Sequence, residues 1–163
     1  MKTKEIIKMA ADNKICQPWH EEMKKDSSLQ NLCKMYFDGD DWAIQNDFPN
    51  LETLRKFKGE SNTYGLFTDH KAVFKTVTVP KLKTAFFGNS DVSLSYAGFT
   101  VAEVIIRHKS KATITVFDYA KLKITILDNA EVEVVSTPNA SVSVFSYGNS
   151  KIKHSGNIKI YKK

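Results

Sequence analysis

The chain of 163 residues has no long hydrophobic run. No apolar segment approaches the roughly 20 residues that a membrane-spanning helix needs. The first 14 residues start basic, as a secretion signal does, but Lys8 and Asp12 interrupt their apolar stretch. With 42% hydrophobic and 26% charged residues, the composition is typical of a globular protein large enough to bury a core. We therefore expect a cytoplasmic protein that does not engage a membrane.

Cysteine and the usual metal-binding motifs are scarce as well. The two cysteines, Cys16 and Cys33, form no CxxC pair, and without a secretion signal they are more typical of free thiols than of a disulfide. His20 lies four residues after Cys16, a spacing that suits zinc, but a clear fourth ligand is missing. We therefore expect two buried or half-buried thiols and no metal site.

The sequence also lacks the motifs that enzymes need. Asp38, Asp40 and Asp41 do not continue with the spacing of a calcium-binding loop, so we interpret them as turn and helix-start carboxylates. His108 and His154 have no Ser, Cys or carboxylate nearby in a catalytic arrangement, and no glycine-rich phosphate loop occurs. We expect no catalytic residue, no cofactor and no enzymatic activity. The alternative is an active site in the N-terminal helices or at their junction with the repeat described next.

The C-terminal half consists of a ten-residue repeat. Residues 111–150 read KATITVFDYA, KLKITILDNA, EVEVVSTPNA and SVSVFSYGNS, with a branched or aliphatic residue at nearly every second position. A short fixed period of this kind is typical of a solenoid, in which each unit buries its apolar side by stacking on its neighbours. Because strand side chains alternate between two faces, positions 2, 4 and 6 are predicted to point inward and positions 1, 3 and 5 outward.

The last positions of each repeat predict how the chain turns. Position 10 is Ser, Thr or Ala, which suits a corner where the backbone folds inward. Position 9 is Asn in four repeats and is preceded there by Gly88, Asp128, Pro138 and Gly148. Asn and Gly tolerate the left-handed conformation of a tight corner, and stacked Asn side chains can form hydrogen-bonded ladders between rungs. Ten residues are too few to close a turn around a packed core. We therefore predict two repeats per rung and about four rungs.

This register places the outward residues of alternate repeats on the same sheet. One outward face combines apolar residues with lysines and is our candidate contact surface, for a partner protein or for self-association. The other resembles an ordinary solvated sheet. The residues that we expect to bind a partner are Lys81, Lys83, Val101, Ile105, Lys121, Lys123 and Phe145. The solvated face is expected to carry Asp91, Ser93, Ser95, Lys111, Thr113, Thr115, Glu131, Glu133, Val135, Lys151 and Lys153.

The N-terminal part reads as short helices with frequent breaks. Apolar residues recur at helical spacing, Ser28 or Ser27 stands where one N-cap is expected, and Asn50 stands where another is expected. The predicted fold is therefore α+β, with a small helical domain at 1–63, a strand-rich transition at 64–80, and a single-stranded β-solenoid of about eight ten-residue half-rungs at 81–163. The predicted helices cover residues 3–13, 18–23, 28–37, 41–46 and 51–57.

The net charge of +6 is unevenly distributed along the chain. Residues 1–80 carry 12 basic and 12 acidic side chains, whereas residues 81–163 carry 12 basic and 6 acidic ones, so the excess lies on the repeat. In one interpretation, lysines on terminal and edge strands discourage strand addition by a second chain. In the other, they form a basic contact surface for nucleic acid or for an acidic protein.

Two segments together resemble a known group of sequences. LCKMYFDGDDWAIQNDFPNLETLRKF at 32–57 and GNSDVSLSYAGFTVAEVIIRHKSKATI at 88–114 are similar to uncharacterised bacterial, phage or mobile-element proteins with a helical head and a decapeptide solenoid. The resemblance implies the fold and a mobile-element context, and no activity. The solenoid also resembles bactofilins in style, but bactofilins have disordered flanking tails, whereas here we expect a folded head.

Three hypotheses on function remain. The first is a binding module that presents a solenoid face to another protein, for example a phage or mobile-element protein that engages a host complex. The second is a structural protein that self-associates. The third is a protein that binds nucleic acid through its surplus of lysines. It is less favoured, because residues 81–163 contain a single arginine, Arg107, and no regular aromatic pattern.

Overall fold

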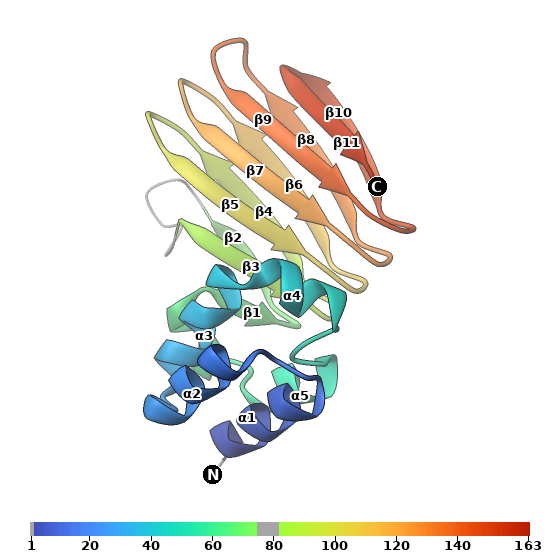
Figure 1. Ribbon diagram of the computed structural model, residues 1–163. Coiled ribbons are helices and arrows are strands. Elements are labelled where there is room, and N and C mark those ends of the chain that lie inside the picture. The colour runs from blue at the N-terminus through green and yellow to red at the C-terminus, as the bar shows by residue number, and fades with distance from the viewer. Residues whose placement is uncertain (1, 75–81) are drawn as a thin grey trace. The chain divides into compact units, whose positions relative to one another are not determined.

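The computed structural model describes residues 2–74 and 82–163 and divides into two compact units (Figure 1). Residues 1–64 form a helical unit, and residues 65–163 form a parallel β-solenoid of about four turns. The predicted α+β fold, with helices followed by a solenoid, is confirmed.

The helical unit is built from short helices whose starts are capped locally. The Ser28 side chain accepts a hydrogen bond from the Asn31 N–H at 3.2 Å, and the Asn50 side chain accepts one from the Thr53 N–H at 3.0 Å, so both caps lie where the sequence predicts them. The described elements are α1 (Lys2–Asp12), α2 (Gln17–Lys25), α3 (Leu29–Asp38), α4 (Asp40–Gln45), α5 (Leu51–Lys56) and the 3-10 helix η1 (Glu60–Tyr64).

These helices enclose a small apolar core, and the two cysteines lie differently with respect to it. Cys33 is buried in α3, and burial raises the pKa of its thiol to about 12. Cys16 is exposed, so the prediction of a buried or half-buried thiol was wrong there, because this residue immediately precedes α2 and stands outside its packed face. Both are free thiols. The buried hydrophobic residues of this core are Ile6, Ala10, Met23, Leu32, Phe48 and Phe57.

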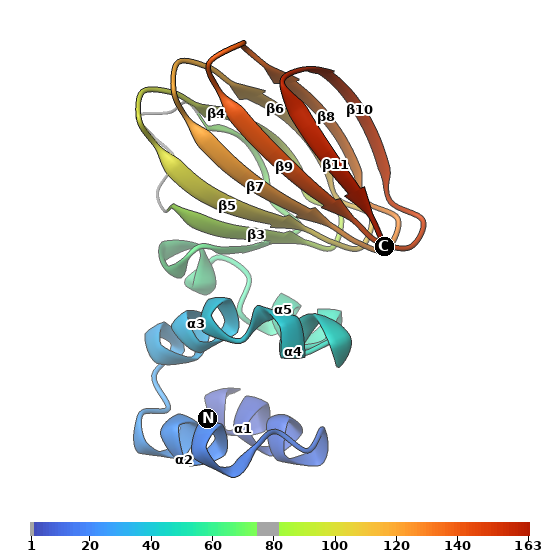
Figure 2. The ribbon, with the colours of Figure 1, turned by 45° about the horizontal axis from the view of Figure 1, so that its top comes forward.

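The strands of the solenoid form two parallel sheets. Sheet A has the order β1-β3-β5-β7-β9-β11 and sheet B the order β10-β8-β6-β4-β2, so the chain alternates between the sheets, as Figure 2 shows. Sheet A comprises β1 (Leu66–Thr68), β3 (Lys83–Phe87), β5 (Val101–Ile106), β7 (Lys121–Ile126), β9 (Ser141–Ser146) and β11 (Ile158–Lys162). Sheet B comprises β2 (Lys71–Phe74), β4 (Asp91–Tyr96), β6 (Lys111–Val116), β8 (Glu131–Ser136) and β10 (Lys151–Gly156).

Neighbouring strands in each sheet are offset by twenty residues over most of the stack. Val104 of β5 pairs with Ile124 of β7, which pairs with Val144 of β9, and all three are buried. The prediction of two repeats per rung is therefore confirmed. Most side chains at the inward positions 2, 4 and 6 are buried and stack in mainly aliphatic ladders, whose burial supplies the hydrophobic stabilisation that a single ten-residue unit cannot provide. The inward prediction was wrong at the two ends of the stack, where Leu82 and His154 are exposed.

The solenoid begins earlier than the aligned repeat. β1 pairs with β3 and β2 pairs with β4, so part of the segment predicted as a transition at 64–80 contributes strands to the two sheets, while residues 75–80 lie outside the described part. Leu66 pairs with Ala85, an offset of nineteen instead of twenty. This single-residue difference puts the first strand out of step with the decapeptide and hides it from a gapless alignment.

The corners turn at position 8 and not at position 9. Position 10 is buried at most of these corners, for example at Ala120 and Ala130, and half-buried at Thr100 and Ser150, which explains why it is small. The prediction that Asn or Gly supplies the left-handed residue is confirmed for Gly88 and Gly148 and was wrong for Asn at position 9, because the turn places that conformation one residue earlier. Positive φ angles of 56 to 72° occur at Gly88, Gly98, His108, Asp118, Asp128 and Gly148.

The last rung is shorter than the others. β10 keeps the twenty-residue offset to β8, but Ile158 of β11 pairs with Val142, an offset of sixteen. Gly156 makes the tight turn with a φ of 93°, and a Cβ at this position would collide with the carbonyl oxygen of Ser136. The Asn157 side chain donates a hydrogen bond to a carbonyl of the preceding corner at 2.9 Å. The partly buried residues that pack against the end of the core are Ile152, Ile158 and Ile160.

Candidate binding surface

The outward side chains of sheet A, which we call face A, include most of the predicted contact residues. Lys83, Lys121 and Lys123 are exposed, and Val101 is 63% exposed. Val101 lies beside Lys121, and Lys83 and Lys123 lie on either side of Glu103 in the register of the sheet. The predicted juxtaposition of lysines with an exposed apolar residue is therefore present.

Of the seven predicted contact residues, one is buried. Ile105 has an outward position on β5, yet only 4% of it is exposed, so its assignment to the contact surface was wrong. The physical reason is that strand alternation assigns a side chain to a face but does not determine what covers it. Lys81 lies outside the described residues.

The far end of face A carries an aromatic pair. Phe145 of β9 stacks on Tyr161 of β11 with ring centroids 5.0 Å apart and an interplanar angle of 15°, and the Lys123 ammonium lies 5.6 Å from the Phe145 centroid. Tyr161 is 45% exposed. Sequence reasoning missed Tyr161 because the shortened last rung moves it four residues out of the decapeptide alignment.

The charges on face A are not paired. Among the described residues of this face, Lys83, Lys121, Lys123 and Lys159 stand against one acidic residue, Glu103. None of these four lysines forms an ion pair with a described residue. Face A therefore presents unbalanced positive charge beside apolar groups.

The outward side chains of sheet B, which we call face B, form compensating charge ladders. Asp91, Lys111, Glu131 and Lys151 follow one another in register, and the Glu131 carboxylate lies 3.8 Å from the ammonium groups of both Lys111 and Lys151. A shallow hollow of about 250 Å³ lies among these side chains and is lined by both signs of charge. Val135 is exposed here, so exposed apolar residues alone do not distinguish the two faces.

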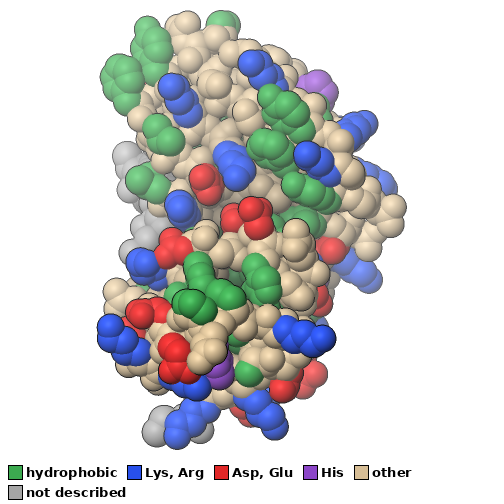
Figure 3. Space-filling model, viewed as in Figure 1, with side chains coloured by type: hydrophobic (Ala, Val, Ile, Leu, Met, Phe, Trp, Pro, Cys, Tyr) green, Lys and Arg blue, Asp and Glu red, His purple; other side chains and the backbone are tan. Residues whose placement is uncertain are grey.

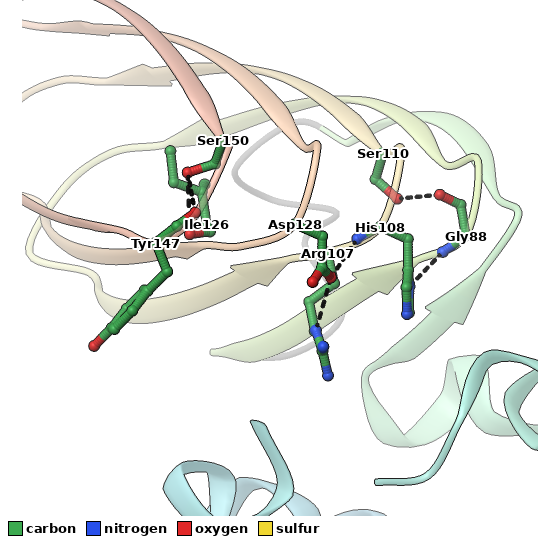
Figure 4. A network of polar contacts seen from close by, with 8 residues as sticks. All are labelled: Gly88, Arg107, His108, Ser110, Ile126, Asp128, Tyr147 and Ser150. Carbon is green, nitrogen blue, oxygen red and sulfur yellow. Dashed lines mark hydrogen bonds and ion pairs between the residues drawn. The ribbon is translucent and has the colours of Figure 1, made fainter. Parts of the chain in front are cut away.

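The corners that follow sheet A are held by hydrogen bonds between rungs (Figure 4). The Gly88 N–H donates to His108 Nδ1 at 3.1 Å, and the His108 N–H donates to Asp128 Oδ2 at 3.0 Å, so the side chain of each rung satisfies the backbone of the rung before it. Asp128 also accepts from the buried Arg107 Nε at 3.2 Å. A bond to Nδ1 requires that this nitrogen carry no proton. His108 is thus a structural acceptor of the corner.

The carboxyl of Asp128 titrates below its ordinary range. Partial burial raises its pKa, but the hydrogen bond from the His108 N–H and the charge and hydrogen bond of Arg107 lower it by more, so that the net shift is downward. The carboxylate is therefore charged at neutral pH and compensates the buried guanidinium.

The opposite corners, which lead from sheet B into sheet A, carry exposed aromatic residues. Phe99 is 83% exposed and Tyr119 is 55% exposed, and their rings stack with centroids 5.3 Å apart and an interplanar angle of 7°. Figure 3 shows hydrophobic side chains gathered at the upper left of the view, where Figure 1 shows these corners. The sequence signal for this pair is an aromatic residue at position 9, where four other repeats have Asn.

Among the described residues 2–74 and 82–163, no group of three or more His, Cys, Asp or Glu side chains is placed to hold a metal ion. No helix in this part of the chain combines the length and the apolar character that crossing a membrane requires.

The fold and the surface together define an α+β protein with a helical unit and a parallel β-solenoid that has two unlike outward faces. Comparison with known proteins adds no relative: no family model, no curated protein and no solved structure matches the chain. The resemblance to mobile-element proteins stays a prediction, and the interpretation of function depends on the geometry.

Proposed function

We propose that this protein is a non-enzymatic binding module that holds another protein on face A. The observation that supports the proposal is the contrast between the outward faces. Face B compensates its charges internally, whereas face A keeps unpaired lysines beside exposed apolar groups. Such a surface gains both electrostatic and hydrophobic contacts when a complementary partner covers it. A mobile-element context would make that partner a component of a host complex.

Self-association is the second candidate function. The structure of the last rung argues against end-to-end association of two solenoids through their C-terminal strands. The exposed edge strands β10 and β11 carry Lys151, Lys153, Lys159 and Lys162, whose charges oppose strand addition by a second copy. The offset of sixteen also gives this rung a different corner from those below it. We therefore expect a monomer by light scattering over a concentration series, and a mass that grows with concentration would favour assembly.

The proposal is tested with matched charge variants of the full chain. The face A variant carries Lys83→Gln, Lys121→Gln and Lys123→Gln, and the face B variant carries the same change at Lys111, Lys151 and Lys153. We expect the protein that copurifies with the wild type from the native host to be lost with the face A variant and retained with the face B variant. Equal retention or equal loss would contradict the proposal. A gel shift at low salt tests nucleic-acid binding on the same proteins.

A further inference from the structure

Four exposed apolar side chains lie at the corners that lead from sheet B into sheet A, and we call them the aromatic corner: Leu82, Phe99, Val101 and Tyr119. Each is more than half exposed. Val101 follows Phe99 by two residues, and the Leu82 carbonyl accepts a hydrogen bond from the Glu103 N–H at 2.8 Å, which connects it to the next strand of sheet A. The four residues therefore belong to neighbouring rungs at one edge of face A.

The two aromatic rings stack on each other without a partner. Phe99 and Tyr119 occupy the same position in successive rungs of the twenty-residue register and stack nearly parallel. The rung that carries Tyr119 is tied to the one before it, because the Gly98 N–H donates to the Asp118 carboxylate at 2.9 Å. A pre-organised apolar group loses little conformational entropy when a partner covers it.

The charge beside the aromatic corner is positive. Lys121 follows Tyr119 by two residues and is the register neighbour of Val101, and Lys123 follows on the same face. The Asp118 carboxylate accepts a hydrogen bond from the Gly98 N–H and keeps its negative charge, so the positive side of the aromatic corner is the one toward the strands of face A. The complementary occupant is therefore acidic and carries at least one aromatic or aliphatic side chain.

A polypeptide fits this surface better than a nucleic acid does. Phe99 and Tyr119 turn one face of each ring toward the other, which leaves fewer ring faces for bases. Leu82 and Val101 offer aliphatic contact, which an apolar side chain uses and a phosphate backbone does not. Arg107, the arginine of the solenoid, is 5% exposed and is paired with Asp128.

We propose that the aromatic corner is the anchor point for an extended acidic segment of a partner protein, in which an apolar side chain packs against Phe99 and Tyr119 while acidic residues meet Lys121 and Lys123. This inference rests on the proposed function of face A and names the chemistry of the partner segment.

The test uses three fluorescent probes with the full-length protein at low salt. They are a random copolymer of glutamate and tyrosine, poly-glutamate of the same length, and oligo(dT). By anisotropy, we expect the copolymer to bind about tenfold more tightly than poly-glutamate, because only the copolymer buries an apolar side chain. Equal affinity for the two polypeptides, or preference for oligo(dT), would overturn the inference.

Variants of exposed residues locate the binding. We expect Phe99→Ser with Tyr119→Ser to reduce copolymer binding about tenfold toward the poly-glutamate level, and Phe99→Leu to retain part of the affinity. The control is Val135→Ser, an exposed apolar residue of face B, which is expected to bind as the wild type does. An unchanged affinity of the double variant, at an unchanged melting temperature, would refute the inference.

The outcomes of this test and of the test of the proposed function can be told apart. If the native partner depends on the lysines of face A but not on Phe99 and Tyr119, the proposed function stands and the anchor is wrong. If the native partner is insensitive to the lysines, the proposed function fails whatever the copolymer does.

Discussion

Faces A and B are built from the same decapeptide, yet they differ in how their charges are used. On face B, Asp91, Lys111, Glu131 and Lys151 alternate in sign along one row, so each charge has an opposite neighbour within its own sheet. On face A, Lys83 and Lys123 lie on either side of one carboxylate, Glu103. Val101 lies beside Lys121, so this lysine has an apolar neighbour there instead of an acidic one. A face whose charges are paired within the sheet gains little electrostatic energy from a partner, whereas a face with unpaired charges is a candidate surface for binding one.

The largest expected effect concerns Gly156, where the two faces end in one shortened rung. Gly156→Ala places a Cβ against the Ser136 carbonyl oxygen at a positive φ, so we expect it to destabilise the last rung by roughly 2–4 kcal/mol. Hydrogen exchange of β10 and β11 measures the loss. Gly98→Ala is the control, because its added Cβ meets nothing within 4 Å and the left-handed backbone alone costs about 1 kcal/mol. Equal effects of the two substitutions would show that the collision does not matter.

The next effect concerns Asp128, at a corner that joins the two faces. Asp128→Asn keeps a residue that tolerates the positive φ but removes the charge that faces Arg107, so we expect a loss of about 1 kcal/mol at neutral pH, reduced by partial solvent exposure. Urea unfolding measures this difference.

The pH dependence of the Asp128 contribution follows from its lowered pKa. A carboxyl whose pKa is lower in the folded state stabilises the fold above its unfolded-state pKa, about 3.9, and loses that contribution as the pH falls through the folded-state value. The wild type and Asp128→Asn should therefore converge in stability below about pH 4. A gap of constant size from pH 7 to pH 3 would contradict this assignment.

The smallest expected effect is the change in stability when the lysines of each face are replaced, which compares the charges of the two faces without a binding partner. Replacing Lys111, Lys151 and Lys153 by Gln removes the attraction of the face B ladders and is expected to cost about 0.5–1 kcal/mol in total. The corresponding triple variant of face A removes lysines that form no ion pair, so it loses only the contact of Lys123 with the Phe145 ring and is expected to cost about 0.5 kcal/mol or less. Thermal melts at low and high salt check both, because salt screens the ladder and should narrow the difference. Similar losses from both triple variants would remove the contrast between the faces.

Much of the fold could be predicted from the sequence because the same pattern of apolar residues recurs in each decapeptide. Val104, Ile124 and Val144 recur at the same position, and stacking is the one arrangement that buries all of them. The Ser28 and Asn50 caps were predictable because capping depends on the residue and its next three neighbours. The candidate surface was predicted in part: the strand alternation placed Lys83, Val101, Lys121 and Lys123 outward, but the burial of Ile105 depends on more than alternation.

By itself, then, the sequence determined which side chains point inward, how many repeats make a rung and that the surplus of lysines lies on the repeat, because these properties follow from local periodicity. The tertiary structure alone decided that Tyr161 stacks on Phe145, that Phe99 stacks on Tyr119 and that His108 accepts a bond from the rung before it. Such contacts join residues sixteen or twenty positions apart, and a change of one or four residues in the offset, as at β1 and β11, moves every pair along the sheet. Register is a property of the assembled stack, and the pairing of charges on each outward face depends on it.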